Sequence, residues 1–167
     1  PPNMPDTRRP SFGAILLAHN ANRTVPDFFE GGGWRPRASV ATLANAMDVG
    51  APSNMERAAY LYPDHGEFSA ALSIASVDDE TIRDTIRSYA DKGHVLDPHT
   101  ACAAKVREGL GGEHWVLAAT AHPAKFESIV EPLIGHEIAL PPALSEILER
   151  PTSNSVIDAD PAALRAI

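Results

Sequence analysis

Apolar and polar residues follow two different rhythms along this chain. Short uninterrupted apolar runs of strand length occupy residues 14–18 and 115–119. Elsewhere apolar residues recur every third or fourth position, as at Ile82, Ile86 and Tyr89, which is the spacing of one helix face. Continuous apolar strands are typical of sheets that helices cover on both faces. The pattern therefore predicts an α/β fold of three layers, with a short, mostly parallel sheet flanked by helices.

Two helices have clear boundary signals. Asp78 is placed to cap a helix that ends at Gly93, and Asp97–Pro98 is placed to begin another that runs to Leu110. An aspartate side chain accepts hydrogen bonds from free N–H groups at a helix start, and proline suits the first helical position. The second helix has a small face that favours close packing, formed by Ala101, Cys102, Ala103 and Ala104.

The remaining elements have weaker signals. Asn20, Asn22 and Thr24 are candidate caps for a helix that the glycines at 31–33 end. Pro123 is expected to start a helix that is kinked or shortened near Pro132. Other expected elements are short strands at 39–43 and 94–96, a helix capped by Ser53 or Asn54, and, after residue 136, a strand, a helix and a terminal helix capped by Asp160.

Composition limits the classes of function. The chain has 167 residues with a net charge of -8, and the sequence shows no run of Lys or Arg beyond Arg8-Arg9. Because nucleic-acid backbones require clustered cations, such a partner is not expected. No apolar stretch approaches the ~20 residues of a membrane span, so no membrane partner is expected either. Cys102 is the single cysteine, which excludes an internal disulfide and favours a reducing, cytoplasmic location.

One domain is expected, preceded by a short arm. Residues 1–11 contain several prolines and match neither a signal peptide nor a transit peptide, so they are interpreted as a linker or disordered arm. Residues 12–167 are then a single α/β domain, since this length is near that of one domain.

Thr120 is the strongest candidate for chemistry. It ends the predicted strand at 115–119, just before the helix expected at Pro123. In open α/β sheets ligands collect beyond the carboxyl ends of the strands, where a hydroxyl can bind a flat ring. The alternative is that Thr120 or His122 only caps the next helix, and the pattern alone favours this cap.

Other chemistries have less support. His94, Asp97 and His99 lie close in sequence, but no HExxH or CxxC spacing accompanies them, which favours structural roles over a metal site. The sequence has no GxSxG elbow, and Cys102 falls on a helix face that is expected to be buried. The glycines at 31–33 lack the spacing of a phosphate-binding loop.

Five segments together resemble one family. ANRTVPDFF, SVATLANAMDVGAPSNMER, VDDETI, LDPHTA and TAHPAKF occur in the order and at about the spacing found in threonine synthases. The resemblance runs from about Phe12 to the end of the chain and covers the C-terminal portion of such enzymes. It implies part of a pyridoxal phosphate (PLP) domain of fold type II. Complete members convert O-phosphohomoserine and water to threonine and phosphate, which is PLP-dependent carbon–oxygen lyase chemistry.

The resemblance gives Thr120 a specific role. Its match in the TAHPAKF segment lies beside the pyridine nitrogen of the cofactor. A neutral hydroxyl at that place would leave the nitrogen largely unprotonated and would suit elimination better than transamination.

The departures from the family are equally informative. The sequence contains no match to the lysine that binds the cofactor covalently or to the glycine-rich loop for its phosphate. Residues 10–13 are at best a remnant of that loop, and Arg23 stands where the family has an acid. No catalytic residue is therefore assigned to this chain, and the chain alone is expected to be inactive.

Three functions remain open at this point. The first is the C-terminal portion of a threonine synthase, which an N-terminal portion or subunit would complete, with self-association possible. The second is a degenerate, non-catalytic paralogue that acts as a binding or regulatory module. The third, with less support, is a histidine-based metalloprotein.

Overall fold

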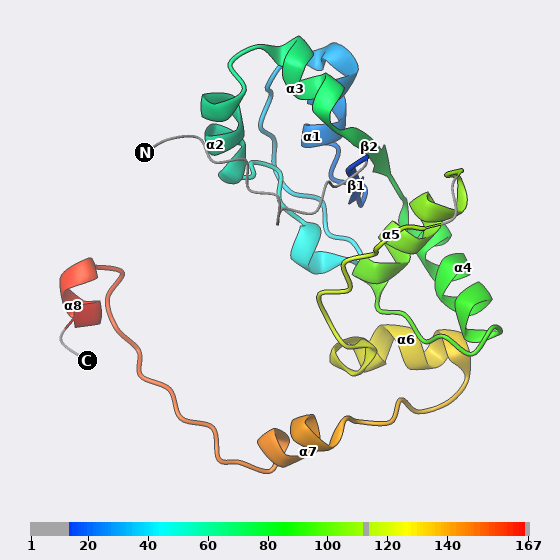
Figure 1. Ribbon diagram of the computed structural model, residues 1–167. Coiled ribbons are helices and arrows are strands. Elements are labelled where there is room, and N and C mark those ends of the chain that lie inside the picture. The colour runs from blue at the N-terminus through cyan, green and yellow to red at the C-terminus, as the bar shows by residue number, and fades with distance from the viewer. Residues whose placement is uncertain (1–13, 112–113, 166–167) are drawn as a thin grey trace, which may run out of the picture.

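A short parallel sheet lies at the start of the fold. The computed structural model describes residues 14–111 and 114–165, so the arm predicted at 1–11 lies outside the described residues. Strand β1 (Leu16–His19) pairs in parallel with β2 (Ser73–Ser76), and His19 lies opposite Ser76 (Figure 1). A parallel sheet with flanking helices confirms the predicted α/β class.

Helices account for most of the regular structure. The main ones are α4 (Asp79–Ala90), α5 (Pro98–Glu108) and α6 (Glu127–Ile134), which pack together beside the sheet (Figure 1). The other helical elements are α1 (Thr24–Asp27), the π-helical turn η1 (Phe28–Gly32), the 3-10 turn η2 (Asn45–Met47), α2 (Asn54–Leu61), α3 (His65–Ala71), the 3-10 turn η3 (Pro123–Phe126), α7 (Pro142–Leu148) and α8 (Pro161–Arg165).

Local capping signals correctly predicted the two central helices. The Asp78 carboxylate accepts a hydrogen bond from the Thr81 N–H at 2.8 Å. The Asp97 carboxylate accepts from the His99 N–H at 2.9 Å. The first of these helices ends at Ala90, before the expected position, and Gly93 lies in the turn that follows it with a φ of 83°, a left-handed conformation that favours glycine. The second ends at Glu108, slightly before the expected position.

The core lies between these helices. Ile82 and Ile86 of α4, Ala101 and Cys102 of α5, and Val130 of α6 are fully buried and form one cluster. The small residues of α5 were expected to pack against a sheet; Ala101, Cys102 and Ala104 are fully buried, and α5 contacts both α4 and strand β1. Ala44 belongs to the same cluster, so the loop that contains it packs against α4 and α5.

The predicted caps of the first helix are wrong. Helix α1 begins after Arg23, which makes no side-chain cap. Asn20 and Asn22 instead point into a buried polar network, and Thr24 is already inside the helix. Their side-chain amides form several hydrogen bonds with residues distant in sequence, whereas a capping side chain would accept only from the first N–H groups of the helix.

Several predicted strands are also absent. Residues 39–43, 94–96 and 115–119 have no strand structure, and Val116 is 97% exposed. Strand β2 and the preceding helix α3 were not anticipated from the sequence. Residues 115–119 are all apolar, but no strand pairs with them among the described residues. Extended apolar backbone becomes a strand only where another strand supplies hydrogen bonds.

The C-terminal part runs away from the core. After α6, the chain continues as a long arm (residues 136–165) that includes α7 and α8 (Figure 1). Asp160 accepts a hydrogen bond from the Ala162 N–H at 3.2 Å, as the predicted cap requires. The strand expected before α7 is absent. Within the described residues, no helix is both long and apolar enough to cross a membrane.

Candidate functional site

A polar network organises the loop formed by residues 39–50, hereafter the central loop. The Asp48 carboxylate accepts hydrogen bonds from the side-chain amides of Asn20 at 2.7 Å and Asn22 at 3.0 Å. It also accepts from the Thr42 hydroxyl at 2.7 Å and the Thr42 N–H at 2.9 Å. Because the two asparagines directly follow β1, the network attaches the central loop to the carboxyl end of that strand.

Asn20 is the centre of this attachment. It is fully buried, and its side-chain amide also donates to the Ala44 carbonyl at 3.1 Å. Its side-chain oxygen accepts from the Asn22 N–H at 2.9 Å, and its backbone carbonyl accepts from the Ser76 hydroxyl at 2.6 Å. The residue therefore joins β1, β2 and the central loop.

The starts of α4 and α5 hold the other side of the central loop. The Leu43 N–H donates to the Asp79 carboxylate at 3.0 Å, and the Ala46 N–H donates to Nε2 of His99 at 3.0 Å. Three segments that are distant in sequence thus meet at one loop, and backbone N–H groups fix its conformation.

His99 continues this connection towards the TAHPAKF segment. Its Nδ1 lies 2.8 Å from a carboxylate oxygen of Asp97, and Asp97 is fully buried. Its ring lies against the ring of Phe126, with 4.9 Å between the centroids and a tilt of 53°. Phe126 ends η3, the turn that follows Thr120. The five segments singled out in the sequence therefore form one continuous set of contacts.

Thr120 is at the open end of this set. Its side chain is exposed, and its hydroxyl has no hydrogen-bond partner among the described residues. The cap of η3 is His122, whose Nδ1 accepts a hydrogen bond from the Ala124 N–H at 3.2 Å. The interpretation of Thr120 as a helix cap is therefore wrong, whereas that of His122 is confirmed.

Two polar side chains, one buried and one half-buried, lie near the network, and no hydrogen bond joins them to it among the described residues. The Thr24 hydroxyl is buried and has no hydrogen-bond partner within the described parts of the chain. His19 ends β1, and its burial lowers the pKa of its ring below the ordinary value of 6.5. A ring with a lowered pKa is neutral at pH 7, so the carboxyl end of the sheet has no added cation there.

Other candidate chemistries have no geometric support. Within residues 14–111 and 114–165, no group of three potential metal ligands is close enough to hold an ion. His99, one of the three residues considered for metal binding, has both ring nitrogens occupied by protein partners. Burial raises the pKa of Cys102 to about 12, with further increases from Asp97 and Asp79. A thiol with this pKa is not a nucleophile at neutral pH.

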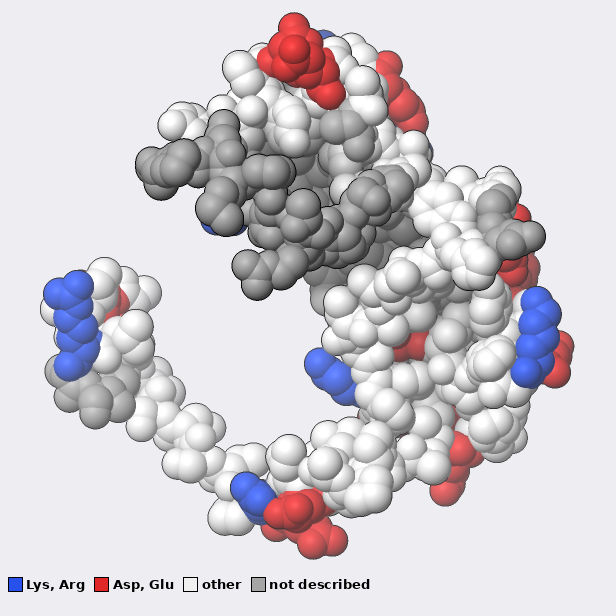
Figure 2. Space-filling view, in the orientation of Figure 1, with Lys and Arg blue, Asp and Glu red and all other residues white. Residues whose placement is uncertain are grey.

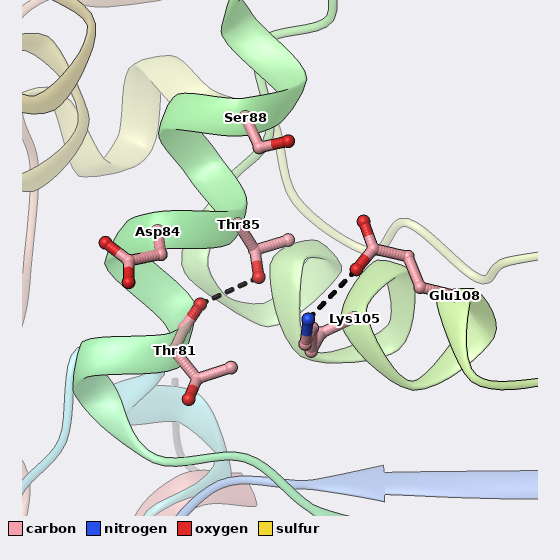
Figure 3. Close-up of a pocket in the computed structure, with 6 residues that line it drawn as sticks. All are labelled: Thr81, Asp84, Thr85, Ser88, Lys105 and Glu108. Atoms are coloured by element: carbon pink, nitrogen blue, oxygen red, sulfur yellow. Dashed lines mark hydrogen bonds and ion pairs between the residues drawn. The ribbon is translucent and has the colours of Figure 1, made fainter.

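A surface hollow between α4 and α5 is a separate feature (Figure 3). The Thr85 hydroxyl in it donates to the Thr81 carbonyl at 2.7 Å, and Lys105 pairs with Glu108 at 3.1 Å. These polar groups bind each other, and Thr120 does not line the hollow. Figure 2 shows charged side chains of both signs at scattered places on the face in view, without a broad cationic patch.

Sequence reasoning missed the role of Asn20, Asn22 and Asp48. Two asparagines spaced one residue apart directly after an apolar strand were a usable signal, since buried amides require several partners. Their partner is 28 residues beyond Asn20, so local pattern alone could not identify it.

Comparison with known proteins gives one consistent family. The family model for the C-terminal part of threonine synthase matches residues 100–167. Threonine synthase of Serratia marcescens is 42% identical over 90% of this chain and 36% of its own length. Threonine synthase of Escherichia coli K12 is 40% identical over 92% of this chain and also 36% of its own length.

Solved structures agree with these matches. The E. coli threonine synthase structure has a TM-score of 0.75 and 39% identity, covering 92% of this chain and 36% of its own. The PLP-bound threonine synthase of Brucella melitensis has a TM-score of 0.73 and 28% identity, covering 84% of this chain and 36% of its own. The chain thus spans about a third of the length of these relatives.

Proposed function

Because this chain belongs to the threonine synthase family and corresponds to its C-terminal portion, we propose that it forms one side of a PLP site. The complete site would convert O-phosphohomoserine and water to threonine and phosphate. An N-terminal portion, present in the relatives and equivalent to most of their length, would supply the rest.

The free hydroxyl of Thr120 is the observation that supports this proposal most directly. It is exposed, has no partner among the described residues, and precedes a turn that His122 caps. A threonine hydroxyl can donate a hydrogen bond to an unprotonated pyridine nitrogen, so the residue fits the cofactor ring. Bound PLP would supply an electron sink for the elimination. Thr120 would orient the ring and, being neutral, would leave its nitrogen largely unprotonated.

The remaining functions of the site must come from elsewhere. The three lysines of this chain are Lys92, Lys105 and Lys125, and none has the sequence context of a cofactor-binding lysine. Lys105 is paired with Glu108 on the surface of α5. The N-terminal portion would therefore provide the covalent attachment and the phosphate-binding loop, and this chain alone would be inactive.

The open segment (residues 114–120) indicates how the two portions would meet. Val116 is 97% exposed, although the segment is mostly apolar. Its sequence predicts a strand buried on both faces, which requires strands beside it and helices over it. Strands of the N-terminal portion would satisfy both needs and would place Thr120 at the carboxyl end of a larger sheet.

A reconstitution experiment tests the proposal. The chain is combined with the N-terminal portion of a threonine synthase, and phosphate release and cofactor absorbance are measured. Thr120→Val should lower kcat about 10- to 100-fold by removing one hydrogen bond in a desolvated site, whereas Thr120→Ser should retain most activity. Thr152→Val, in the exposed arm, is the matched control and should behave like the unmodified chain. Absence of both phosphate and cofactor absorbance with the unmodified chain would overturn the proposal.

The alternative of a non-catalytic binding module has less structural support. It relied partly on Arg23, but this guanidinium pairs with Asp27 at 3.0 Å and with Glu30 at 2.7 Å. The substitution therefore has a structural role within α1 and η1. A self-sufficient module should also cover its apolar side chains, whereas this chain exposes several large ones: Val116, Ile147, Leu148, Val156 and Leu164.

A further inference from the structure

His99 lies where the central loop, α5 and η3 meet, and both of its ring nitrogens are engaged. Nε2 is 3.0 Å from the Ala46 backbone nitrogen, and Nδ1 is 2.8 Å from a carboxylate oxygen of Asp97. The side chain of His99 is only 9% exposed. A ring this enclosed has few orientations that satisfy both neighbours.

The two partners determine where the ring proton resides. A backbone N–H can only donate, so Nε2 must accept from Ala46 through its lone pair. The single proton of the neutral ring is therefore on Nδ1, from which it is donated to Asp97. A proton on Nε2 would instead set two donors against each other and would break the contact with Ala46.

Asp97 is held firmly enough to maintain this arrangement. It is fully buried, and one carboxylate oxygen accepts from the His99 N–H at 2.9 Å. The other oxygen accepts from the Thr100 hydroxyl. An acceptor with so many donors cannot rotate away without leaving buried polar groups unpaired, which is costly. The carboxylate thus selects both the orientation and the tautomer of His99.

The consequences reach the turn that follows Thr120. The His99 ring contacts the Phe126 ring, and Phe126 is partly buried against the core cluster. One side chain thus binds a backbone N–H of the central loop on one side and the last residue of η3 on the other. His99 therefore links these two segments.

We propose that His99 is a positioning residue of this site. As the neutral ring protonated on Nδ1, it fixes the Ala46 peptide and the Phe126 ring, and thereby the turn that presents Thr120. It does not touch the reacting atoms. Its effect on turnover rests on the proposed function, whereas its tautomer and its hold on Ala46 do not.

The unmodified chain provides the first test. Two-bond hydrogen–nitrogen NMR spectra of the 15N-labelled chain report which ring nitrogen carries the proton, and the spectrum of His99→Gln assigns the signals. The proposal requires protonated Nδ1 and unprotonated Nε2 at pH 7. A proton on Nε2, or averaging between the two nitrogens, would overturn it.

A matched pair of variants provides the second test. In His99→Gln the amide oxygen reaches about as far as Nε2 and can accept from Ala46, whereas the amide in His99→Asn reaches only Asp97. Amide exchange at Ala46 should accelerate about tenfold in His99→Asn and stay within about threefold in His99→Gln, since the hydrogen bond to the Ala46 N–H is lost only in the former. The Ile82 amide, which donates to the Asp78 carbonyl at 2.9 Å, reports overall stability. Two results would show a general structural role and would overturn the proposal. One is equal acceleration of Ala46 exchange in both variants, and the other is acceleration at Ala46 that occurs only together with acceleration at Ile82.

The reconstituted site tests the functional consequence. His99→Asn should lower kcat about tenfold with KM nearly unchanged, and His99→Gln should restore most of it, because only the glutamine can replace the bond to Ala46. If the unmodified mixture releases no phosphate, the proposed function fails, but the tautomer and exchange results still decide the role of His99. If both variants turn over equally, His99 does not position the site.

Discussion

The central loop and the open segment differ in one physical respect, which is whether other described parts of the chain bind them. The central loop is irregular and polar, but Asn20, Asp79 and His99 fix it through hydrogen bonds with three other parts of the chain. The open segment is mostly apolar, but Val116 is 97% exposed. A region with partners inside the chain is ordered despite an unfavourable composition. A region with the composition of a buried strand stays exposed where the described residues supply no neighbouring strand.

Removing the carboxylate of the central loop should have the largest effect. Asp48→Ala removes the charged acceptor that the amides of Asn20 and Asn22 and the N–H of Thr42 share, and Asn20 is fully buried. We expect the free energy of unfolding to fall by about 3 kcal/mol, because several donors lose a charged partner at once. Urea unfolding followed by circular dichroism measures this change.

The control for that variant is Asp158→Ala in the exposed arm. This substitution should change the free energy of unfolding by less than about 0.5 kcal/mol, as is usual for surface positions. If both aspartate variants proved equally mild, the central loop would owe its order to something other than the network around Asp48.

The same substitution at two valines separates the two regions more finely. Val130 is fully buried in the core, whereas Val116 is 97% exposed. Val130→Ala should lower the free energy of unfolding by about 2 kcal/mol through lost burial and a cavity. Val116→Ala should leave the isolated chain unchanged and weaken its association with an N-terminal portion.

Thermal unfolding and a titration with the N-terminal portion measure these two effects. An equal loss of stability for both variants of the isolated chain would mean that the open segment already packs within it. Unchanged association after Val116→Ala would mean that the N-terminal portion does not cover this side chain.

Sequence alone predicted the features that depend on near neighbours. The caps Asp78 and Asp97 act on residues within three positions, so their effect is visible in a short window. The small face of α5 was likewise visible, because helix periodicity is local. The resemblance of the five segments to one family is confirmed by the relatives and by their solved structures.

The features that were missed depend on distant partners. Asn20 and Asn22 had the right residue types for helix caps, but Asp48 lies 28 residues beyond Asn20 and binds both. Residues 115–119 were predicted as a strand from composition, and the prediction failed because hydrogen bonds from neighbouring strands are needed as well. This failure is the basis for our proposal that an N-terminal portion covers this surface. The role of Thr120 in cofactor binding stays a prediction.

The smallest expected effect concerns the Thr24 hydroxyl, which is buried beside the network and has no hydrogen-bond partner in the described part of the chain. Thr24 is 2% exposed, and its oxygen accepts and donates no hydrogen bond there. Replacing it by the similarly shaped valine removes an unsatisfied polar atom, so Thr24→Val should raise the free energy of unfolding by about 1 kcal/mol. Thr152→Val in the exposed arm should leave it unchanged, and thermal unfolding of both variants provides the comparison. A loss of stability in Thr24→Val would show that the hydroxyl does bind a partner, such as an enclosed water. The hydrogen-bond network around the central loop would then include Thr24 of α1 through that water.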